Sequence, residues 1–380
     1  MKDDSASGNV RLSDRQRVNW LRLIRTENVG PATFRDLINR FGSAEIALEM
    51  LPELMLSGGA TRLVRIPTVQ QAESELEAAH RYGARFIAIG EADYPPMLRR
   101  MDNPPPLVAV RGTAGVFRLP TVAIVGARNA SLAGIKMARM LASELGRDGY
   151  AVASGLARGI DTAAHQGALA SGTIAVLAGG LDHIYPPENI DLCHEIAERG
   201  GAVISEMPFG WEPRAKDFPR RNRIVAGLSL GLVVVEAAKR SGSLISARLA
   251  GEMGRLVFAV PGSPLDPRSA GANGLLKDGA ILVTEARDII EQVAPLIGQT
   301  PPPAVSLEEP PDFSATPPPH DDDRARLVEA LGPVPVSVDE LIHYTGLHPA
   351  QVFMILLELD LAGRLERHAG GAVSLLVLEP

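Results

Sequence analysis

Eight short apolar runs alternate with amphipathic segments between residues 86 and 297, and this alternation constrains the fold most strongly. The runs lie at 86–89, 122–125, 150–153, 174–177, 202–204, 232–235, 257–260 and 281–283. Because they are apolar throughout, they fit strands that are buried on both faces. Helical stretches at 131–147, 159–171 and 243–253 lie between them. The pattern predicts an α/β domain with a Rossmann-like, doubly wound parallel sheet that binds its ligand at the carboxyl ends of the strands.

Two smaller regions flank this predicted domain. Residues 1–85 have apolar residues at helical spacing, and Asn28-Val29-Gly30-Pro31 separates two helices of a unit that resembles a SAM or helix-hairpin-helix domain. Such a hairpin either holds a DNA backbone at its glycine turn or serves packing and partner binding. Residues 324–380 predict three helices and a two-stranded wing around Gly370-Gly371, which is the winged-helix pattern.

The third helix of the winged-helix region has an unusual charge for a DNA-reading helix. The segment at 349–362 contains two acidic residues and no basic residue. A helix that enters a DNA groove needs donors for phosphates and bases. We therefore interpret residues 324–380 as a protein-contact module.

Charge separates the folded regions from a linker. The net charge is −7, and residues 298–323 hold six acidic residues, eight prolines and no Lys or Arg, so the rest of the chain carries only −1. Such a segment predicts an extended linker between domains at 1–85, 86–297 and 324–380. The single cysteine, Cys193, fits a reducing cytoplasm, and without a run of 18 apolar residues we expect no membrane insertion.

The segment SGLARGIDTAAHQGAL at 154–169 joins an apolar strand to a helix through a glycine-containing loop. Ser154, Gly155 and Gly159 allow a close backbone approach, and free N–H groups at a helix start bind anions. Arg158 adds a planar donor suited to phosphate. Asp161 either caps the helix or is catalytic, and His165 is interpreted as a packing histidine.

Two further strand-to-helix connections offer donors to phosphate. Gly126 and Arg128 follow the strand at 122–125, although this arrangement also occurs in ordinary turns. No GxGxxG motif is present there, which argues against a standard NAD site. Ser241, Gly242 and Ser243 follow the strand at 232–235 and stand at another predicted helix start.

The run PRAKDFPRRNR at 213–223 is the most basic stretch of the chain. It predicts a surface that follows a phosphodiester backbone, with one aromatic ring for a base. The residues expected to bind are Lys216, Phe218, Arg220, Arg221, Asn222 and Arg223. Neither metal-ligand spacing nor a GxxxxGK[ST] loop appears in the sequence, and no nucleophile elbow is present. We therefore expect a protein that binds a polymer, without a cofactor or a catalytic residue.

Several collinear motifs resemble the DNA-processing protein A family (DprA/Smf). They include YPPMLRRMDNPPPLVAVRG (94–112), VAIVGARNAS (122–131), SGLARGIDTAAHQGAL (154–169), GGLDHIYPPEN (179–189), ISEMPFG (204–210), FPRRNRIVAGLS (218–229), VVEAAKRSGSLISARLA (234–250) and VFAVPGSP (257–264). Ala127 and Ser246 stand where many members have Ser and Thr, and neither change alters a charge.

The resemblance implies a function and partners. It implies a cytoplasmic, non-enzymatic protein that dimerises through its Rossmann-like domain, binds and protects single-stranded DNA, and loads RecA recombinase during natural transformation. It carries Arg128 and the FPRRNR run over as DNA contacts. Two alternatives remain open: a nucleotide-processing enzyme of the phosphoribohydrolase type, whose PGGxGTxxE motif is missing here, and an adaptor that binds no DNA.

Overall fold

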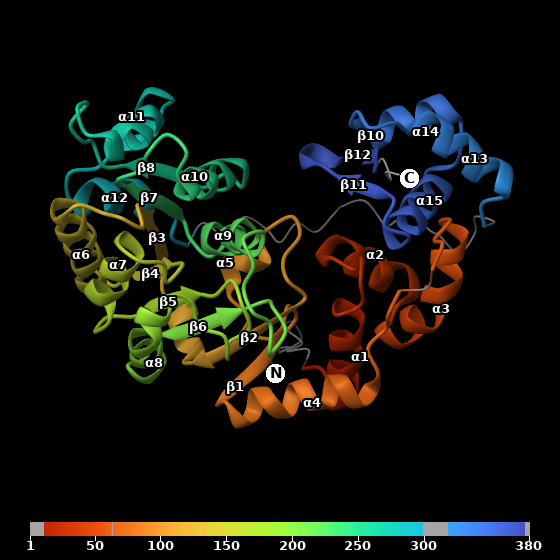
Figure 1. Cartoon of the computed structure of the whole chain (residues 1–380), viewed down its shortest axis with the longest axis horizontal. Helices are drawn as coiled ribbons and strands as arrows, with labels where there is room; N and C mark the ends of the chain where they lie inside the picture. The colour runs from red at the N-terminus through yellow and green to blue at the C-terminus, as the bar shows by residue number, and fades with distance from the viewer. Residues whose placement is uncertain (1–10, 63, 299–317, 377–380) are drawn as a thin grey trace, which may run out of the picture. The chain divides into compact units, whose positions relative to one another are not determined.

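The computed structural model describes residues 11–62, 64–298 and 318–376, and these form two compact units (Figure 1). The first, here the central unit, runs from Glu73 to residue 298 and includes Arg11 and Leu12. The second, here the terminal unit, combines residues from Ser13 to Ala72 with those from 318 onward. A segment near the start of the chain and its C-terminal part therefore share one unit. The boundaries expected from composition remain predictions.

A nine-stranded sheet is the framework of the central unit. Its strand order is β1-β2-β6-β5-β4-β3-β7-β8-β9. The strands are β1 (Ala84–Ala88), β2 (Leu107–Gly112), β3 (Thr121–Gly126), β4 (Ala151–Ser154), β5 (Thr173–Val176), β6 (Ala202–Ser205), β7 (Gly231–Val235), β8 (Leu256–Ala259) and β9 (Ile281–Leu282). From β6 to β9 all neighbours are parallel, as the apolar runs predicted.

The sheet is mixed at one edge. The strand β2 was not among the predicted apolar runs. The pairs β1–β2 and β2–β6 are antiparallel, which corrects the expectation of a wholly parallel sheet. A strand order that runs outward from β3 to β6 and then returns to β7 beside β3 places a switch point between β3 and β7. In open α/β sheets the ligand crevice lies at the carboxyl ends of the strands at such a point.

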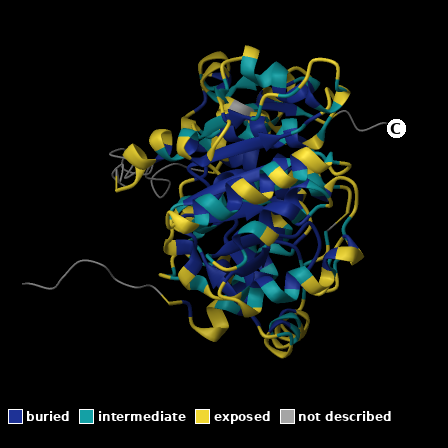
Figure 2. Ribbon diagram, turned by 90° about the vertical axis from the view of Figure 1, so that its left-hand side faces the viewer, coloured by how far each residue is buried: buried dark blue, intermediate teal, exposed yellow. Residues whose placement is uncertain are grey.

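Helices cover both faces of the sheet, and the strands' alternating side chains supply both cores. Val122 and Ile124 pack with α6 (Leu132–Arg147), α7 (Ile160–Ala168) and α12 (Ala286–Val293). Ala123 and Val125 face the opposite core, formed with α5 (Pro96–Arg99), α9 (Asp217–Gly227), α10 (Gly242–Glu252) and α11 (Ala270–Lys277). The helix α8 (Ile190–Glu198) packs against β2, β5 and β6. Figure 2 shows the buried strands and the exposed outer sides of the helices.

The terminal unit joins a helical hairpin domain to a winged helix. The N-terminal part contains α1 (Asp14–Ile24), α2 (Pro31–Phe41) and α3 (Ala44–Ser57), and the unit boundary falls within α4 (Val69–Arg81). The C-terminal part contains α13 (Asp321–Ala330), α14 (Val338–Thr345), α15 (Pro349–Leu361) and a sheet of β10 (Val336–Ser337), β12 (Ala372–Leu375) and β11 (Leu365–Arg367). The helices and the wing match the expected pattern, but α13 begins inside the segment predicted as linker. Most of that segment lies outside the described residues.

Candidate nucleic-acid interface

Five connections lie at the carboxyl ends of the parallel strands around the switch point. They comprise residues 127–131 after β3, 155–159 after β4, 177–189 after β5, 206–216 after β6 and 236–241 after β7. All four sequence-predicted binding segments are at this edge. The fold therefore brings Arg128, Arg158 and the basic run to one side of the sheet.

The connection after β3 has its helix-start donors occupied by the protein itself. Glu236, at the end of β7, accepts a hydrogen bond from the backbone N–H of Ser131 at 2.8 Å and a short one from the Ser131 hydroxyl. Its carboxylate therefore stands at the N-terminus of α6, where we expected a phosphate. A Cβ on Gly126 would collide with the carbonyl oxygen of Val235, so close strand packing explains this glycine.

The loop after β4 is likewise closed by an internal carboxylate. Buried Asp161 accepts hydrogen bonds from the N–H groups of Gly155 at 3.1 Å and Ala157 at 3.3 Å. The hydroxyl of Ser154 is buried and donates to the carbonyl of Ile124 at 2.6 Å. Burial raises the pKa of the Asp161 carboxyl, although Arg221 and the loop donors oppose that shift. The expected phosphate contacts of Ser154 and Gly155 are therefore replaced by internal ones.

Arg221 lies beneath this loop and does not face solvent. It is 5% exposed, and its guanidinium donates to the backbone carbonyls of Gly155 and, at 2.6 Å, Val176. Burial lowers its pKa to about 10, so it remains charged at neutral pH. A Cβ on Gly155 would meet the same guanidinium. The expected DNA contact of Arg221 is thus corrected to a contact that joins α9 to the ends of β4 and β5.

Residues of the connection after β5 hold the remainder of the loop at 155–159. The Asn189 side chain donates to the carbonyl of Leu156 at 2.8 Å and to the hydroxyl of Thr162 at 2.9 Å. Gly159 adopts a φ of 75°, and a Cβ there would collide with the carbonyl of Ala127. Exposed Arg158 pairs with Glu188 at 2.7 Å. Asn189 was not predicted from the sequence as a site residue, although it ends the motif at 179–189.

His165 is a packing residue, as expected. It is fully buried, and its Nδ1 lies 2.7 Å from the hydroxyl of Thr173. Burial, with a smaller contribution from nearby Arg221, lowers the pKa of His165 to about 3. A neutral imidazole with so low a pKa is a poor general base at neutral pH.

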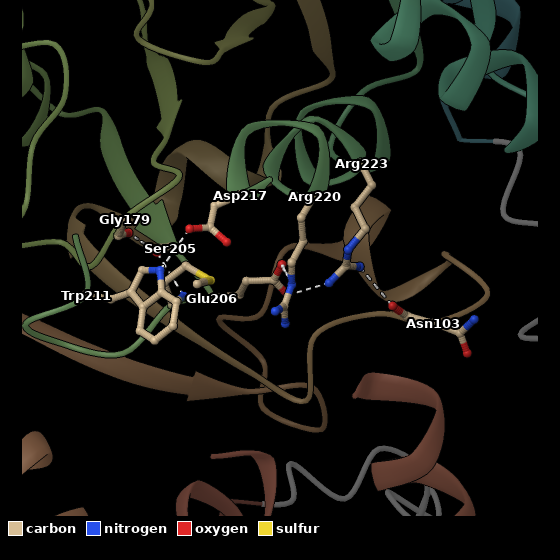
Figure 3. Close-up of polar contacts among 9 residues, drawn as sticks. Asn103, Gly179, Ser205, Glu206, Trp211, Asp217, Arg220 and Arg223 are labelled. Atoms are coloured by element: carbon tan, nitrogen blue, oxygen red, sulfur yellow. Dashed lines mark hydrogen bonds and ion pairs between the residues drawn. The ribbon is translucent and has the colours of Figure 1, made fainter. Parts of the chain in front are cut away.

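The basic run is partly helical, because α9 begins at Asp217. The Asp217 carboxylate accepts from the N–H of Arg214 at 2.8 Å and from Trp211 Nε1 at 3.0 Å. Figure 3 shows the indole contact. These bonds fix the segment before α9, so that Lys216 and Phe218 stand at the start of the helix.

Two arginines of the run share a buried carboxylate. Glu206, at the end of β6, is 7% exposed and accepts from Arg220 Nε at 2.9 Å and from Arg223. Arg223 also donates to the carbonyl of Asn103 at 3.0 Å. Figure 3 shows both arginines reaching from α9 to Glu206. The Arg220 side chain remains 47% exposed, whereas that of Arg223 is 18% exposed, so Arg220 has more surface available to a ligand.

An arginine and two aromatic rings are in contact near the start of α9. The Arg128 guanidinium lies 5.2 Å from the centre of the Phe218 ring, which also makes an edge contact with Tyr185 at 5.6 Å. Among the described residues, no carboxylate pairs with exposed Arg128 or Lys216. Arg128 covers one face of Phe218, whereas Tyr185 is 45% exposed. Tyr185 therefore offers the more accessible ring, and its place in the motif at 179–189 was the only sequence signal for it.

The start of α10 retains donors without a carboxylate cap. Ser241 accepts from the N–H of Ser243, and the two hydroxyls lie 2.7 Å apart. Asn222 donates to the carbonyl of Gly242 at 3.4 Å, which joins α9 to this helix start.

The exposed cations and rings at this edge of the sheet form one candidate binding surface. We name the group Arg128, Tyr185, Lys216, Phe218 and Arg220 the carboxyl-end surface.

The described residues hold neither a metal-ligand cluster nor a membrane-spanning helix. They contain no group of three His, Cys, Asp or Glu residues arranged to hold a metal ion. None of their helices is both long and apolar enough to span a membrane.

The fold and this edge of the sheet define a Rossmann-like binding protein with two accessory helical modules, and comparisons with known proteins identify its family. Residues 85–294 match the model of "DNA recombination-mediator protein A". Residues 14–78 match the "DprA-like N-terminal HHH domain", and residues 309–371 match the "DprA winged helix domain". The chain therefore belongs to the DprA/Smf family.

Similar proteins span most of the chain. Protein Smf of Escherichia coli is 40% identical over 318 residues, which cover 83% of this chain and 84% of that protein. The DprA structure from Streptococcus pneumoniae is 30% identical, has a TM-score of 0.61, and covers 74% of this chain and 99% of its own. The DprA structure from Helicobacter pylori, described for its single-stranded DNA binding mode, is 30% identical with a TM-score of 0.51, covering 56% and 96%.

Proposed function

We propose that this protein binds single-stranded DNA at the carboxyl-end surface of its central unit. The observation that carries the proposal is the Phe218 ring, which contacts the Arg128 guanidinium and the Tyr185 ring and lies beside Lys216 at the start of α9. Cations hold phosphates, and aromatic rings stack with bases of any sequence. The relative from Helicobacter pylori, whose description names single-stranded DNA binding, supports the same ligand.

The carboxylates bound within the connections after β3 and β4 favour a polymer over a nucleotide as the ligand. Glu236 and Asp161 take the donors that a mononucleotide phosphate would use in a Rossmann-like domain. The exposed cationic groups belong to the long side chains of Arg128, Lys216 and Arg220. Such side chains suit the extended phosphodiester backbone of a DNA strand. Single-stranded binding surfaces combine such cations with stacking rings.

We propose further that the protein binds DNA without catalysing a reaction. The candidate acids and bases near the surface have structural partners: Asp161 binds loop amides, Glu206 binds two arginines and Glu236 caps α6. His165 is buried and has a lowered pKa. These contacts leave none of the four side chains poised as a general acid or base.

Family membership supports a proposed role in recombination. On this view the protein protects incoming single strands, loads RecA recombinase during natural transformation, and acts in the cytoplasm as a homodimer through the Rossmann-like domain. Sedimentation of the full chain measures the dimer. Loading is measured by RecA-driven strand exchange on a strand coated with single-stranded-DNA-binding protein. If this protein loads RecA, adding it should make the exchange faster.

The binding proposal is tested by measuring the affinity for a labelled dT oligonucleotide across a salt series. Each phosphate contact contributes about 0.7 to the slope of log K against log salt for single strands. Arg128→Ala and Lys216→Ala are each expected to weaken binding and to lower the slope by about that amount. The control is Arg147→Ala, because Arg147 lies at the opposite end of α6.

Two results would contradict the proposal. One is wild-type binding that is absent or indifferent to salt. The other is that Arg128→Ala and Arg147→Ala change the affinity and its salt slope equally. Hydrolysis of a nucleoside monophosphate by the wild-type protein would instead support the phosphoribohydrolase alternative.

A further inference from the structure

The third winged-helix helix, α15, is buried on two sides within the terminal unit. Its buried residues are Ala350, Val352, Met354, Ile355, Leu356, Leu357, Glu358, Leu359 and Leu361. Val352, Ile355 and Leu356 pack in the winged-helix core. Met354, Leu357 and Leu361 pack in a second core with residues of α2 and α3. The surface that a DNA-reading helix would present to a groove is therefore covered by the N-terminal helices.

The hairpin before α2 meets the last turn of α15. The Asn28 side chain donates to the carbonyl of Leu361 at 3.1 Å, and the Thr33 hydroxyl donates to the Asp360 carboxylate at 2.9 Å. Thr33 is in the first turn of α2, whose N-cap residue, Gly30, makes no side-chain capping bond. The carbonyl end of one helix thus faces the amide end of another, which is a favourable arrangement of helix dipoles.

Asp360 lies in the last turn of α15, where a negative charge is unfavourable. A negative side chain in the last turn of a helix is repelled by the partial negative charge at that end. Asp360 is instead stabilised from outside α15, by Thr33 and by Arg367, whose Nε lies 2.9 Å away and whose Nη2 reaches Asp36 at 3.1 Å. An acid that its own helix disfavours and a neighbouring domain binds indicates an interface function.

Backbone contacts extend this interface. Arg364 donates to the carbonyl of Gly58 at 3.0 Å. A Cβ on Gly58 would collide with the carbonyl oxygen of Glu358, so α3 ends directly against the backbone of α15. The other acid of α15, Glu358, is 2% exposed and forms a bidentate pair with Arg324, with both distances at 2.8 Å. Both acids noted in the sequence therefore have partners within the terminal unit.

We propose that α15 and the hairpin at 28–33 are a dedicated interface between the two ends of the chain, and that the Asp360 carboxylate occupies the place at the start of α2 that a DNA phosphate would take. The winged-helix module thereby covers the hairpin at 28–33, and the N-terminal helices cover the apolar face of α15. A phosphate backbone reaches the hairpin only when this contact opens, and binding at the carboxyl-end surface does not require that opening.

The proposal is tested in the full chain by hydrogen exchange of the two contact segments. Asp360→Asn keeps the shape and removes the charge, while Gly58→Leu forces the helices apart without changing a charge. We expect both variants to raise exchange in residues 28–34 and 355–361 together, by about tenfold or more. Asp339→Asn, an exposed acid on α14 in the same module, is the control and should change neither segment. If exchange rises in neither segment or in only one, the interface proposal is wrong.

A duplex DNA probe tests the phosphate-mimic part with the same measurement. In Asp360→Asn, we expect added duplex to protect the amides at 32–34 and to bind at least tenfold more tightly than it binds wild type. Protection of those amides in wild type as well would overturn the masking claim. Protection in neither protein would overturn the claim that Asp360 replaces a phosphate. Single-strand affinity at the carboxyl-end surface should stay within about twofold throughout, so failure here is separate from failure of the proposed function.

Discussion

At the residue scale, three neighbouring arginines of one basic run have three different environments. Arg221 is buried against backbone carbonyls, Arg223 is mostly covered by Glu206 and Asn103, and Arg220 keeps half of its side chain exposed. The sequence predicted the run and its strand-end location. It could not separate the three roles, because they depend on the helical phase of α9 and on Glu206, which is 14 residues or more away in the sequence.

Arg221 provides a test of this division. Arg221→Met leaves the buried carbonyls of Gly155 and Val176 without their guanidinium donor, and each unsatisfied buried group typically costs about 1–3 kcal/mol of stability. We expect a large loss of thermal stability and weaker DNA binding, with a salt slope equal to that of wild type. Arg220→Ala should lower the slope while keeping the melting temperature near that of wild type. A reduced slope in Arg221→Met, at a temperature where it remains folded, would show that Arg221 contacts a phosphate.

Tyr185 is expected to be the principal stacking ring. Tyr185→Ala should weaken single-strand binding by about 1–3 kcal/mol, or roughly 5-fold to 150-fold, without changing the salt slope. Tyr185→Phe is the matched control, because it keeps the ring, and should bind within about twofold of wild type. Fluorescence anisotropy with a dT strand measures both. Equal losses in the two variants would assign the effect to the hydroxyl group instead of stacking.

His165 predicts a specific acid sensitivity. Its folded-state pKa of about 3 lies below the unfolded value near 6.5, so the unfolded chain binds the extra proton and stability falls as the pH drops below 6.5. Between pH 7 and 5.5 this group alone should cost about 1 kcal/mol. Urea unfolding of wild type and His165→Gln at both pH values isolates that cost. An identical pH dependence in the two proteins would contradict a buried neutral imidazole.

At the scale of elements, the helix starts show which features of the site were predictable. The glycine-containing connections after β3 and β4 were located from sequence because strand and helix periodicities differ. Their occupants were not, because Glu236 lies on a connection more than 100 residues after Ser131. For Asp161 the sequence left a capping and a catalytic role open; the structure places it in the first turn of α7, where it binds amides of the loop just before its own helix. Local partners are thus predictable, whereas partners supplied by another strand end require the sheet order.

Glu236 provides a test at this scale. Glu236→Ala removes the carboxylate from the N-terminus of α6 and should cost about 1–2 kcal/mol of stability. Added sulfate should recover part of that loss by binding at the freed donors. The control, Glu252→Ala, changes an exposed acid near the end of α10 and should show neither effect. A loss that sulfate does not reduce would argue against an anion site at this helix start.

At the scale of the whole molecule, we propose that DNA binding and domain contact belong to different units. The sequence identified the winged-helix pattern and, from the acids of the segment at 349–362, a protein-contact role for it. It could not identify the partner, because the N-terminal hairpin is more than 300 residues away in the sequence. Within the terminal unit, the partner is the other end of the same chain.

The central claim is that single-stranded DNA binds the carboxyl-end surface and leaves the terminal interface closed. Hydrogen exchange of the full wild-type chain, with and without a dT oligonucleotide, tests both parts. We predict protection in residues 126–131, 183–189 and 214–220, with no change in residues 28–34 and 349–361. Protection confined to the terminal segments, with none around Arg128 and Phe218, would contradict the account.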